Sequence, residues 1–133
     1  MVSRAGTLLI PSGPTNNTGL KHLHIVCTDP CVRGYQMLVS VTTWTNHLCD
    51  GTCILEADDH DWLTHQSWVM YRKTRLEEAT TLDNGVDLGI FIPKQMMQNE
   101  VFDRVVAGIC LSPQTPRKMK NYFGCPVKEP GDA

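Results

Sequence analysis

HLHIVCTDPCVRGYQMLVSVTT, residues 22–43, is the stretch that decides the fold class. Its first part, His22 to Thr28, is rich in β-branched and apolar residues and stops at Asp29-Pro30, as strands often do. A turn follows from Cys31 to Gly34. Tyr35 to Thr43 then has the apolar run that is typical of a buried strand. These segments predict an antiparallel hairpin.

Further strands are predicted after the hairpin. Thr52 to Leu55 is short and apolar, and Ser67 to Leu76 alternates between two faces. One of these faces is expected to hold Val69, Tyr71, Lys73 and Arg75. Between the two strands, Glu56 to Asp61 holds four carboxylates in six residues, which indicates a surface loop. Val86 to Ile92 follows the turn signal Asn84-Gly85 and is predicted as a fifth strand or an irregular turn.

The spacing of apolar residues along the chain changes at Pro93, where they begin to recur at helical intervals. This pattern predicts a helix from Pro93 to Leu111, or one that begins later, near Asn99. A second short helix is expected to open at Thr115-Pro116. Strands followed by helix predict a mainly β domain, a small barrel of about five strands with a C-terminal α-helix.

Residues 20–123 are predicted as one domain, because a chain of 133 residues leaves little room for two. Residues 1–19 are expected to be a flexible leader, with at most a short edge segment around Thr7 to Ile10, and residues 124–133 a flexible tail. The sequence has no apolar run of about 18 residues and no secretory signal pattern. We therefore expect a cytoplasmic protein without a membrane span.

Six cysteines are present, and two pairs, Cys27/Cys31 and Cys49/Cys53, share a C-x3-C spacing. In a cytoplasmic protein we expect reduced thiols rather than disulfides. Small apolar strand residues and turn residues account for these pairs better than a zinc site does, but a zinc module remains an alternative. The acidic loop lacks the spacing of a calcium-binding loop, so no metal ligands are predicted.

Taken in order, the strand ends resemble those of the PemK/MazF toxin family. Val26 to Pro30 takes the place of a V-L-S-P-like turn, Val39 to Thr43 that of a P-x-T-[ST]-like strand end, and Ser67 to Arg75 that of a later strand with Ser and Arg near its ends. The resemblance covers roughly residues 20–111 and, through Asp58-Asp59-His60, points to a divergent PemK-like subgroup. It implies an SH3-like barrel with a terminal helix, a homodimer, an antitoxin partner, and cleavage of single-stranded RNA without a metal or other cofactor.

Metal-free RNA cleavage needs a base, an acid and a cation that stabilises the phosphorane. Because histidine as a residue type can act as acid or base in neutral solution, His60 and His65 are candidates for these roles. Arg75 matches the family position for the cation. The predicted substrate-binding residues are Lys21, His22, Thr42, Thr43 and Arg72. The Thr42/Thr43 strand end and Arg75 are expected to line the same groove.

Two departures from the family pattern keep a second hypothesis open. Leu20-Lys21-His22 stands where the family has a loop arginine, and Lys73 stands near the place of a glutamine. The formal net charge of −2 also argues against binding nucleic acid by bulk electrostatics. The alternative function is therefore a non-catalytic barrel that binds a protein or nucleic-acid partner.

Overall fold

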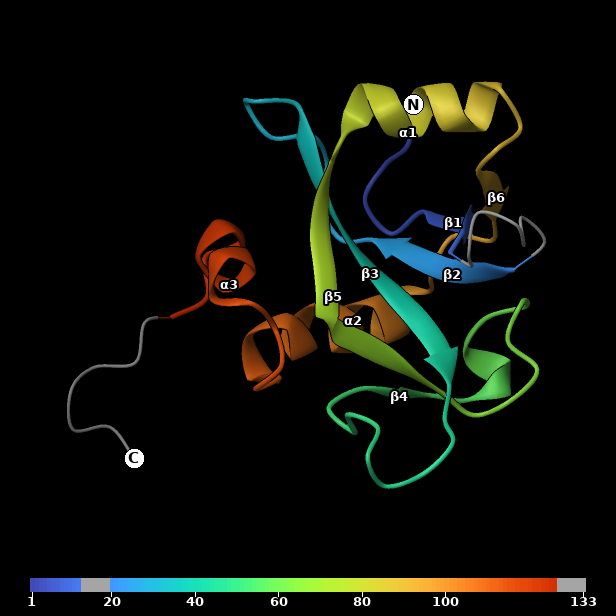
Figure 1. Ribbon diagram of the computed structural model, residues 1–133, viewed down its shortest axis with the longest axis vertical. Helices are drawn as coiled ribbons and strands as arrows, with labels where there is room; N and C mark the ends of the chain where they lie inside the picture. Colours follow the sequence, from blue (N-terminus) through green and yellow to red (C-terminus); the bar gives the residue numbers. More distant parts are fainter. Residues whose placement is uncertain (13–19, 127–133) are drawn as a thin grey trace.

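The computed structural model describes residues 1–12 and 20–126 and confirms the mainly β fold (Figure 1). Six strands of the described chain form one curled antiparallel sheet, a half barrel, in the order β4-β5-β3-β2-β1-β6. Their bounds are β1 Thr7–Pro11, β2 Lys21–Val26, β3 Tyr35–Thr43, β4 Ile54–Leu55, β5 Ser67–Glu78 and β6 Ile92–Lys94.

The predicted hairpin is confirmed as β2 and β3, with Leu23 opposite Val41 and Val26 opposite Leu38. The turn between them closes where the Cys31 N–H donates to the Tyr35 carbonyl at 2.9 Å. Gly34 in this turn has a φ of +82°, a conformation that costs glycine little and other residues more.

The edge segment predicted around Thr7 to Ile10 is instead an internal strand. β1 pairs with β2 on one side and with β6 on the other, and Leu8, Leu9 and Ile10 are buried. The prediction missed this because β6, which covers the outer edge of β1, comes from residues more than 80 positions away. The rest of the predicted leader, residues 13–19, and the tail beyond residue 126 lie outside the described residues.

Helix α1 (Ala79–Asp87) replaces the polar turn predicted around Asn84-Gly85, and the strand predicted for Val86 to Ile92 is reduced to β6 at its end. Leu82 of α1 is fully buried. A Cβ added at Gly85 would overlap the Phe91 ring, so only glycine lets that ring lie against the helix. Tertiary packing of this kind outweighs a weak local propensity for a turn.

The C-terminal helices follow the prediction. Helix α2 (Asn99–Leu111) takes the later of the two predicted starts, and α3 (Arg117–Phe123) begins just after Pro116. No helix within the described residues is long and apolar enough to cross a membrane.

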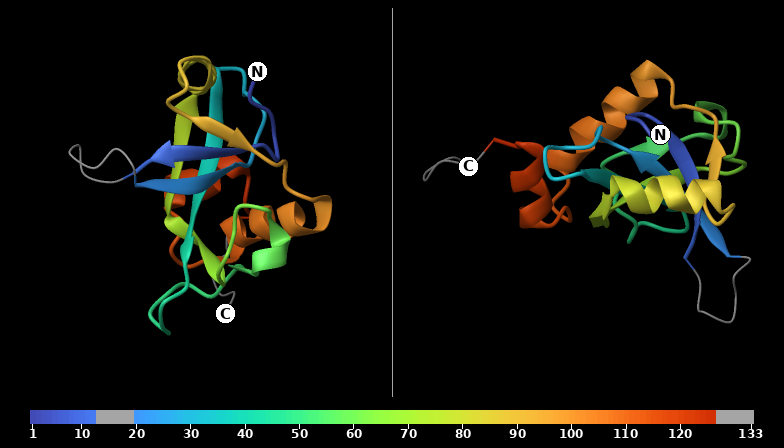
Figure 2. Two further views of the ribbon diagram at one scale, coloured as in Figure 1. Left: turned by 90° about the vertical axis from the view of Figure 1, so that its right-hand side faces the viewer. Right: turned by 90° about the horizontal axis from the view of Figure 1, so that it is seen from above.

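The two faces of the sheet carry separate hydrophobic cores, and α1 and α2 lie on opposite sides of the strands (Figure 2). The larger core lies between the sheet and α2, where Phe102, Val105 and Ile109 meet Leu23, Ile25 and other strand residues. The smaller core lies under α1 and consists of Leu8, Ile10, Val26, Leu38 and Leu82. Because α1 covers only part of its face, the rest of that face stays available for other groups.

A register shift between β3 and β5 changes which side chains of β5 face each core. Leu38 is opposite Arg75, but Ser40 is opposite Met70, so residues 71–74 of β5 oppose a single residue of β3. The predicted alternation is therefore wrong after Tyr71. Val69 and Tyr71 enter the larger core, whereas Arg75 lies on the other face with Leu38. The Thr74 hydroxyl donates to the Tyr71 carbonyl at 2.6 Å within the shift.

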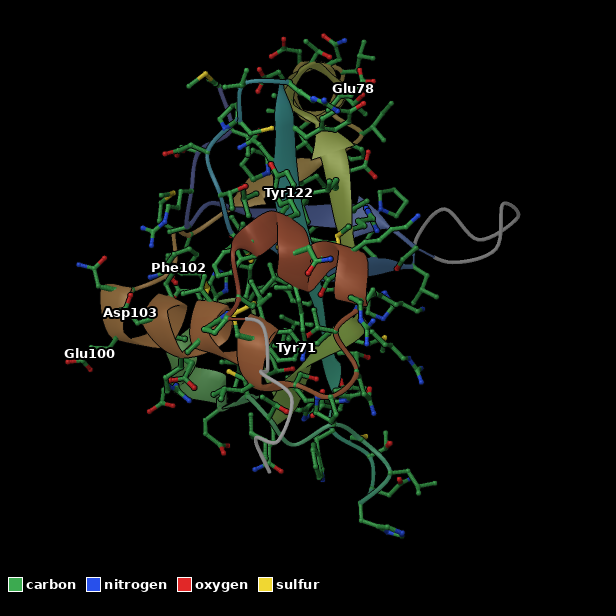
Figure 3. All side chains as sticks on the ribbon, turned by 90° about the vertical axis from the view of Figure 1, so that its left-hand side faces the viewer. Tyr71, Glu78, Glu100, Phe102, Asp103 and Tyr122 are labelled. Carbon is green, nitrogen blue, oxygen red and sulfur yellow. A yellow bond between two sulfur atoms is a disulfide. The ribbon has the colours of Figure 1, made fainter. Side chains whose placement is uncertain are left out.

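Tyr71 ties this irregular segment to α2. Its hydroxyl donates to the Val105 carbonyl at 2.6 Å, and the ring is fully buried (Figure 3). A Cβ at Gly108 would overlap the Tyr71 hydroxyl, so the close approach of strand and helix depends on this glycine.

The substitution Gly108→Ala tests this contact. Alanine favours a helix by up to about 1 kcal/mol, but the overlap displaces Tyr71 and breaks its hydrogen bond, so we expect a net loss of about 2 kcal/mol in the free energy of unfolding. Gly51→Ala is the control, because its Cβ would meet only the Trp44 ring at 3.7 Å. Equal urea midpoints for the two variants would contradict the packing described here.

Candidate functional site

Polar and cationic side chains gather on the sheet face that α1 leaves uncovered. They line a pocket of about 240 Å³, here called the basic pocket, whose wall consists of Pro11, Ser12, His22, His24, Ser40, Met70, Lys73 and Arg75. The residues come from the end of β1 and from β2, β3 and β5. No carboxylate lines the basic pocket, which gives it a positive local charge although the chain as a whole is negative.

Strand alternation explains why two histidines face this pocket. In β2, Leu23 and Ile25 enter the larger core, so His22 and His24 lie on the opposite face. His24 is opposite Ser40, which is in turn opposite Met70. The register shift in β5 brings Lys73 and Arg75 to the same pocket, although regular alternation places them with Tyr71.

His24 is the more buried of the two histidines, with 3% of its surface exposed. Its Nδ1 lies 2.9 Å from the His22 carbonyl, which can only accept, so Nδ1 carries the proton and Nε2 keeps a lone pair. Burial lowers the pKa of His24 from 6.5 to about 4, and the nearby charges of Arg75 and His22 act in the same direction. At neutral pH this ring is therefore an uncharged acceptor.

His22 is only half-buried and lies closer to solvent. Its Nδ1 is hydrogen-bonded to the Ser12 hydroxyl. Partial burial, and then the positive charge of Lys73, lower the pKa of His22 below 6.5. The neutral imidazole is thus the main form at pH 7, which is the form that accepts a proton.

The two cations of the pocket differ in whether they already form an ion pair within the fold. Arg75 donates from Nε to Glu77 at 2.9 Å, and both side chains are partly exposed. Lys73 is exposed and forms no ion pair with any residue that the structure describes. Lys73 is therefore the group most available to an incoming anion, while Arg75 would have to share its charge with Glu77.

Among the residues proposed from sequence, His22 and Arg75 meet in the basic pocket. Thr42 lies on the same face of β3 as Ser40, and continuing the β2–β3 register by one residue sets it opposite His22. Thr43 points to the other face. It lines a different cavity, of about 330 Å³, together with Trp62 and His65. The expected shared groove fails for Thr43, and Thr42 lies beside His22 without lining the pocket that holds Arg75.

Lys21 and Arg72 do not line the basic pocket, although each is next to a residue that does. Sequence analysis missed His24, Ser40 and Lys73. The spacing His-x-His within a strand was a usable signal for His24, because residues two apart share a face. The place of Lys73 depends on the register shift, which local sequence does not specify.

His60 lies elsewhere, with 3% of its surface exposed. Its Nδ1 accepts from the Trp62 N–H at 3.0 Å, and its Nε2 donates to the Gln95 carbonyl at 2.8 Å. Thr7 donates to the same carbonyl at 2.7 Å. Both ring nitrogens are thus occupied within the fold. The catalytic role of His60 stays a prediction, and these contacts favour a role in joining the acidic loop to β1 and to the residue after β6.

The acidic loop is tied down by hydrogen bonds. The Glu56 N–H donates to Asp59 at 2.8 Å, and Arg104 of α2 donates to the same carboxylate at 3.1 Å. Within residues 1–12 and 20–126, no three His, Cys, Asp or Glu side chains gather as metal ligands would.

The six cysteines fall into three pairs. Cys27 and Cys53 are free and buried, as expected of small apolar residues, and burial raises the pKa of Cys27 to about 12. Cys31 and Cys49 are free and partly exposed. Cys110 and Cys125 form a disulfide between α2 and the segment just after α3. The expectation of reduced thiols is therefore wrong for this pair, because the packing of α3 on α2 brings together two residues that the sequence separates.

The chain matches no protein-family model, and no curated protein matches it. What the basic pocket does must therefore be inferred from its own geometry.

The low pKa of His24 predicts an acid-sensitive fold. The unfolded state binds a proton below about pH 6.5, but the folded ring does so only near pH 4, so stability falls as the pH drops through this window. At about 1.4 kcal/mol per pH unit, the full loss is about 3 kcal/mol.

Urea unfolding of wild type and His24→Gln between pH 7 and pH 4 measures this loss. We expect the fall in unfolding free energy to be smaller in the variant by about the same 3 kcal/mol, whatever its stability at pH 7. Parallel curves for the two proteins would show that His24 is not buried in its neutral form.

Proposed function

We propose that this chain is a metal-independent endoribonuclease of the PemK/MazF type and that single-stranded RNA is cut in the basic pocket. The observation that supports this proposal is the meeting of two neutral imidazoles, His22 and His24, with two cations, Lys73 and Arg75, around one pocket. These are the groups that phosphodiester cleavage without a metal requires, namely a proton acceptor and positive charge at the phosphate.

In the proposed reaction, His22 takes the proton of a 2′-hydroxyl. The 2′-oxygen attacks the adjacent phosphorus, and the bond from phosphorus to the 5′-oxygen breaks. The protonated ring of His22 then returns its proton to the leaving 5′-oxygen, so no proton is gained or lost overall. The products are a 2′,3′-cyclic phosphate and a 5′-hydroxyl end.

The other side chains of the pocket have positioning and electrostatic roles in this proposal. Lys73 and Arg75 stabilise the negative charge that builds up on the phosphorane oxygens. The Ser40 hydroxyl donates to a phosphate oxygen, and the Thr42 hydroxyl beside the pocket donates to a neighbouring one. His24 accepts a hydrogen bond through its free Nε2 and so orients a ribose hydroxyl. Together these groups hold one phosphodiester and its ribose against His22.

A second candidate is a non-catalytic module that binds RNA or a protein in the same pocket. Two observations favour it. The ion pair between Arg75 and Glu77 leaves less charge for a transition state. The neutral state of both imidazoles at pH 7 leaves no ready proton donor before the first step. Binding of RNA without any cleavage would select this alternative.

The family resemblance adds two further proposals, a homodimer and a protein antitoxin that neutralises the chain. Both can be examined by measuring the mass of the purified protein in solution and by asking whether a short reading frame beside its gene encodes a protein that binds it.

The central test is RNA cleavage in EDTA with mapped ends. We expect the wild type to cut single-stranded RNA and leave 2′,3′-cyclic phosphate ends, and His22→Ala to lower kcat by about 10²–10⁴-fold. His65→Ala is the matched control, because His65 lines the other cavity. The proposal for the basic pocket is rejected if His65→Ala loses activity while His22→Ala keeps it.

The charge of Lys73 gives a test that needs no activity. Because Lys73 lowers the pKa of His22, the substitution Lys73→Gln is expected to raise that pKa, as followed by NMR titration of the imidazole protons. Lys94→Gln serves as the control, since Lys94 lies outside the basic pocket. An unchanged His22 pKa in Lys73→Gln would mean that the two side chains do not share the pocket.

A further inference from the structure

A second group of cations lies at α3, away from the residues of the basic pocket. Here a cleft of about 770 Å³, called the α3 cleft below, is lined by Pro113, Thr115, Arg117, Lys120, Asn121, Cys125 and Pro126. None of these residues lines the basic pocket, and none is acidic. The basic pocket and the α3 cleft are therefore both lined by cations, but no residue lines both of them.

The polar groups of the α3 cleft are donors. Arg117 presents a guanidinium, Lys120 an ammonium and Asn121 an amide, one helical turn or less apart on α3. Neither Arg117 nor Lys120 forms an ion pair with another residue in the described part of the chain. Two unpaired cations beside an amide donor are suited to an anion with several acceptor oxygens, because a guanidinium matches phosphate geometry.

The cleft is also held in shape before any ligand arrives. The disulfide Cys110–Cys125 joins the end of the cleft to α2. The Cys125 N–H donates to the Lys120 carbonyl at 2.9 Å, and the Tyr122 hydroxyl donates to the Tyr35 carbonyl at 3.3 Å. Figure 3 shows α3, with Tyr122 labelled, in front of strand β5. These ties hold the backbone of α3 against α2 and β3.

We propose that the α3 cleft is a phosphate-binding site in which Arg117 and Lys120 bind the charged oxygens and Asn121 donates a further hydrogen bond. The phosphate can come from a free ion or from a nucleic-acid strand. A strand is geometrically reasonable, because α3 packs beside β5, the strand that carries Arg72, Lys73 and Arg75 (Figure 1). The site does not depend on catalysis in the basic pocket.

The test is an NMR titration of the ¹⁵N-labelled full chain, in separate arms, with inorganic phosphate and with a short oligouridylate. In at least one arm, saturable shifts of the amides of residues 115–121 are expected. The double variant Arg117→Ala/Lys120→Ala should weaken this binding by more than about tenfold, since hydrogen bonds to charged groups are worth about 1.5–3 kcal/mol each.

Lys118→Ala is the matched control, because it removes a cation from the same helix but not from the cleft wall. Equal weakening by Lys118→Ala and by the double variant would show only diffuse attraction to α3 and would contradict the proposed site. The absence of any saturable shift in both arms would also contradict it.

The two arms separate the sources of the phosphate. Saturation by inorganic phosphate indicates a free anion. Saturation by oligouridylate alone indicates a strand, and the double variant should then reduce the dependence of log K on log salt by about 1.4, at about 0.7 for each cation. Lys73→Ala must leave the response of residues 115–121 in place. This result would hold even if the RNA cleavage proposed for the basic pocket were absent.

Discussion

The register shift between β3 and β5 is the constraint on which the rest of this structure depends. Across it, residues 71–74 of β5 oppose one residue of β3. Before the shift, Tyr71 points into the larger core and bonds to the Val105 carbonyl of α2. After it, Arg75 emerges on the other face. One local irregularity thus anchors the helix on one side of the sheet and supplies cations to the other, as bulges often do near functional sites.

The sheet face under α1 is divided into an apolar part and a polar part because α1 is too short to cover all of it. The helix covers Leu8, Ile10, Val26 and Leu38, which form the smaller core, and ends before the half of the sheet that carries His24 and Ser40. The polar pocket therefore borders directly on buried apolar side chains. This position explains the low pKa of His24, because burial, and then the positive charge of Arg75, disfavour the protonated imidazole.

Positive charge is local in this protein. The formal net charge is −2, and four of the 14 acidic residues lie in the loop from Glu56 to Asp61. The cations of the basic pocket and of the α3 cleft line two separate openings, and Glu77 is the one acidic residue in ion-pair contact with them among the described residues. A phosphate-bearing ligand would meet these cations at short range, where the net charge of the chain matters little.

The sequence by itself determined the elements whose patterns are strong and local. The hairpin of β2 and β3, the long strand β5, helix α2 with two possible starts, and the short α3 were all predicted, because apolar spacing and turn residues act over a few positions. It also singled out His22 and Arg75, which meet in the basic pocket. Tertiary structure alone decided the internal place of β1, the helix α1, the face of Lys73 and the pairing of Cys110 with Cys125. Each of these depends on contacts between segments far apart in the chain, and burial of such contacts outweighs the weak preferences of the local sequence.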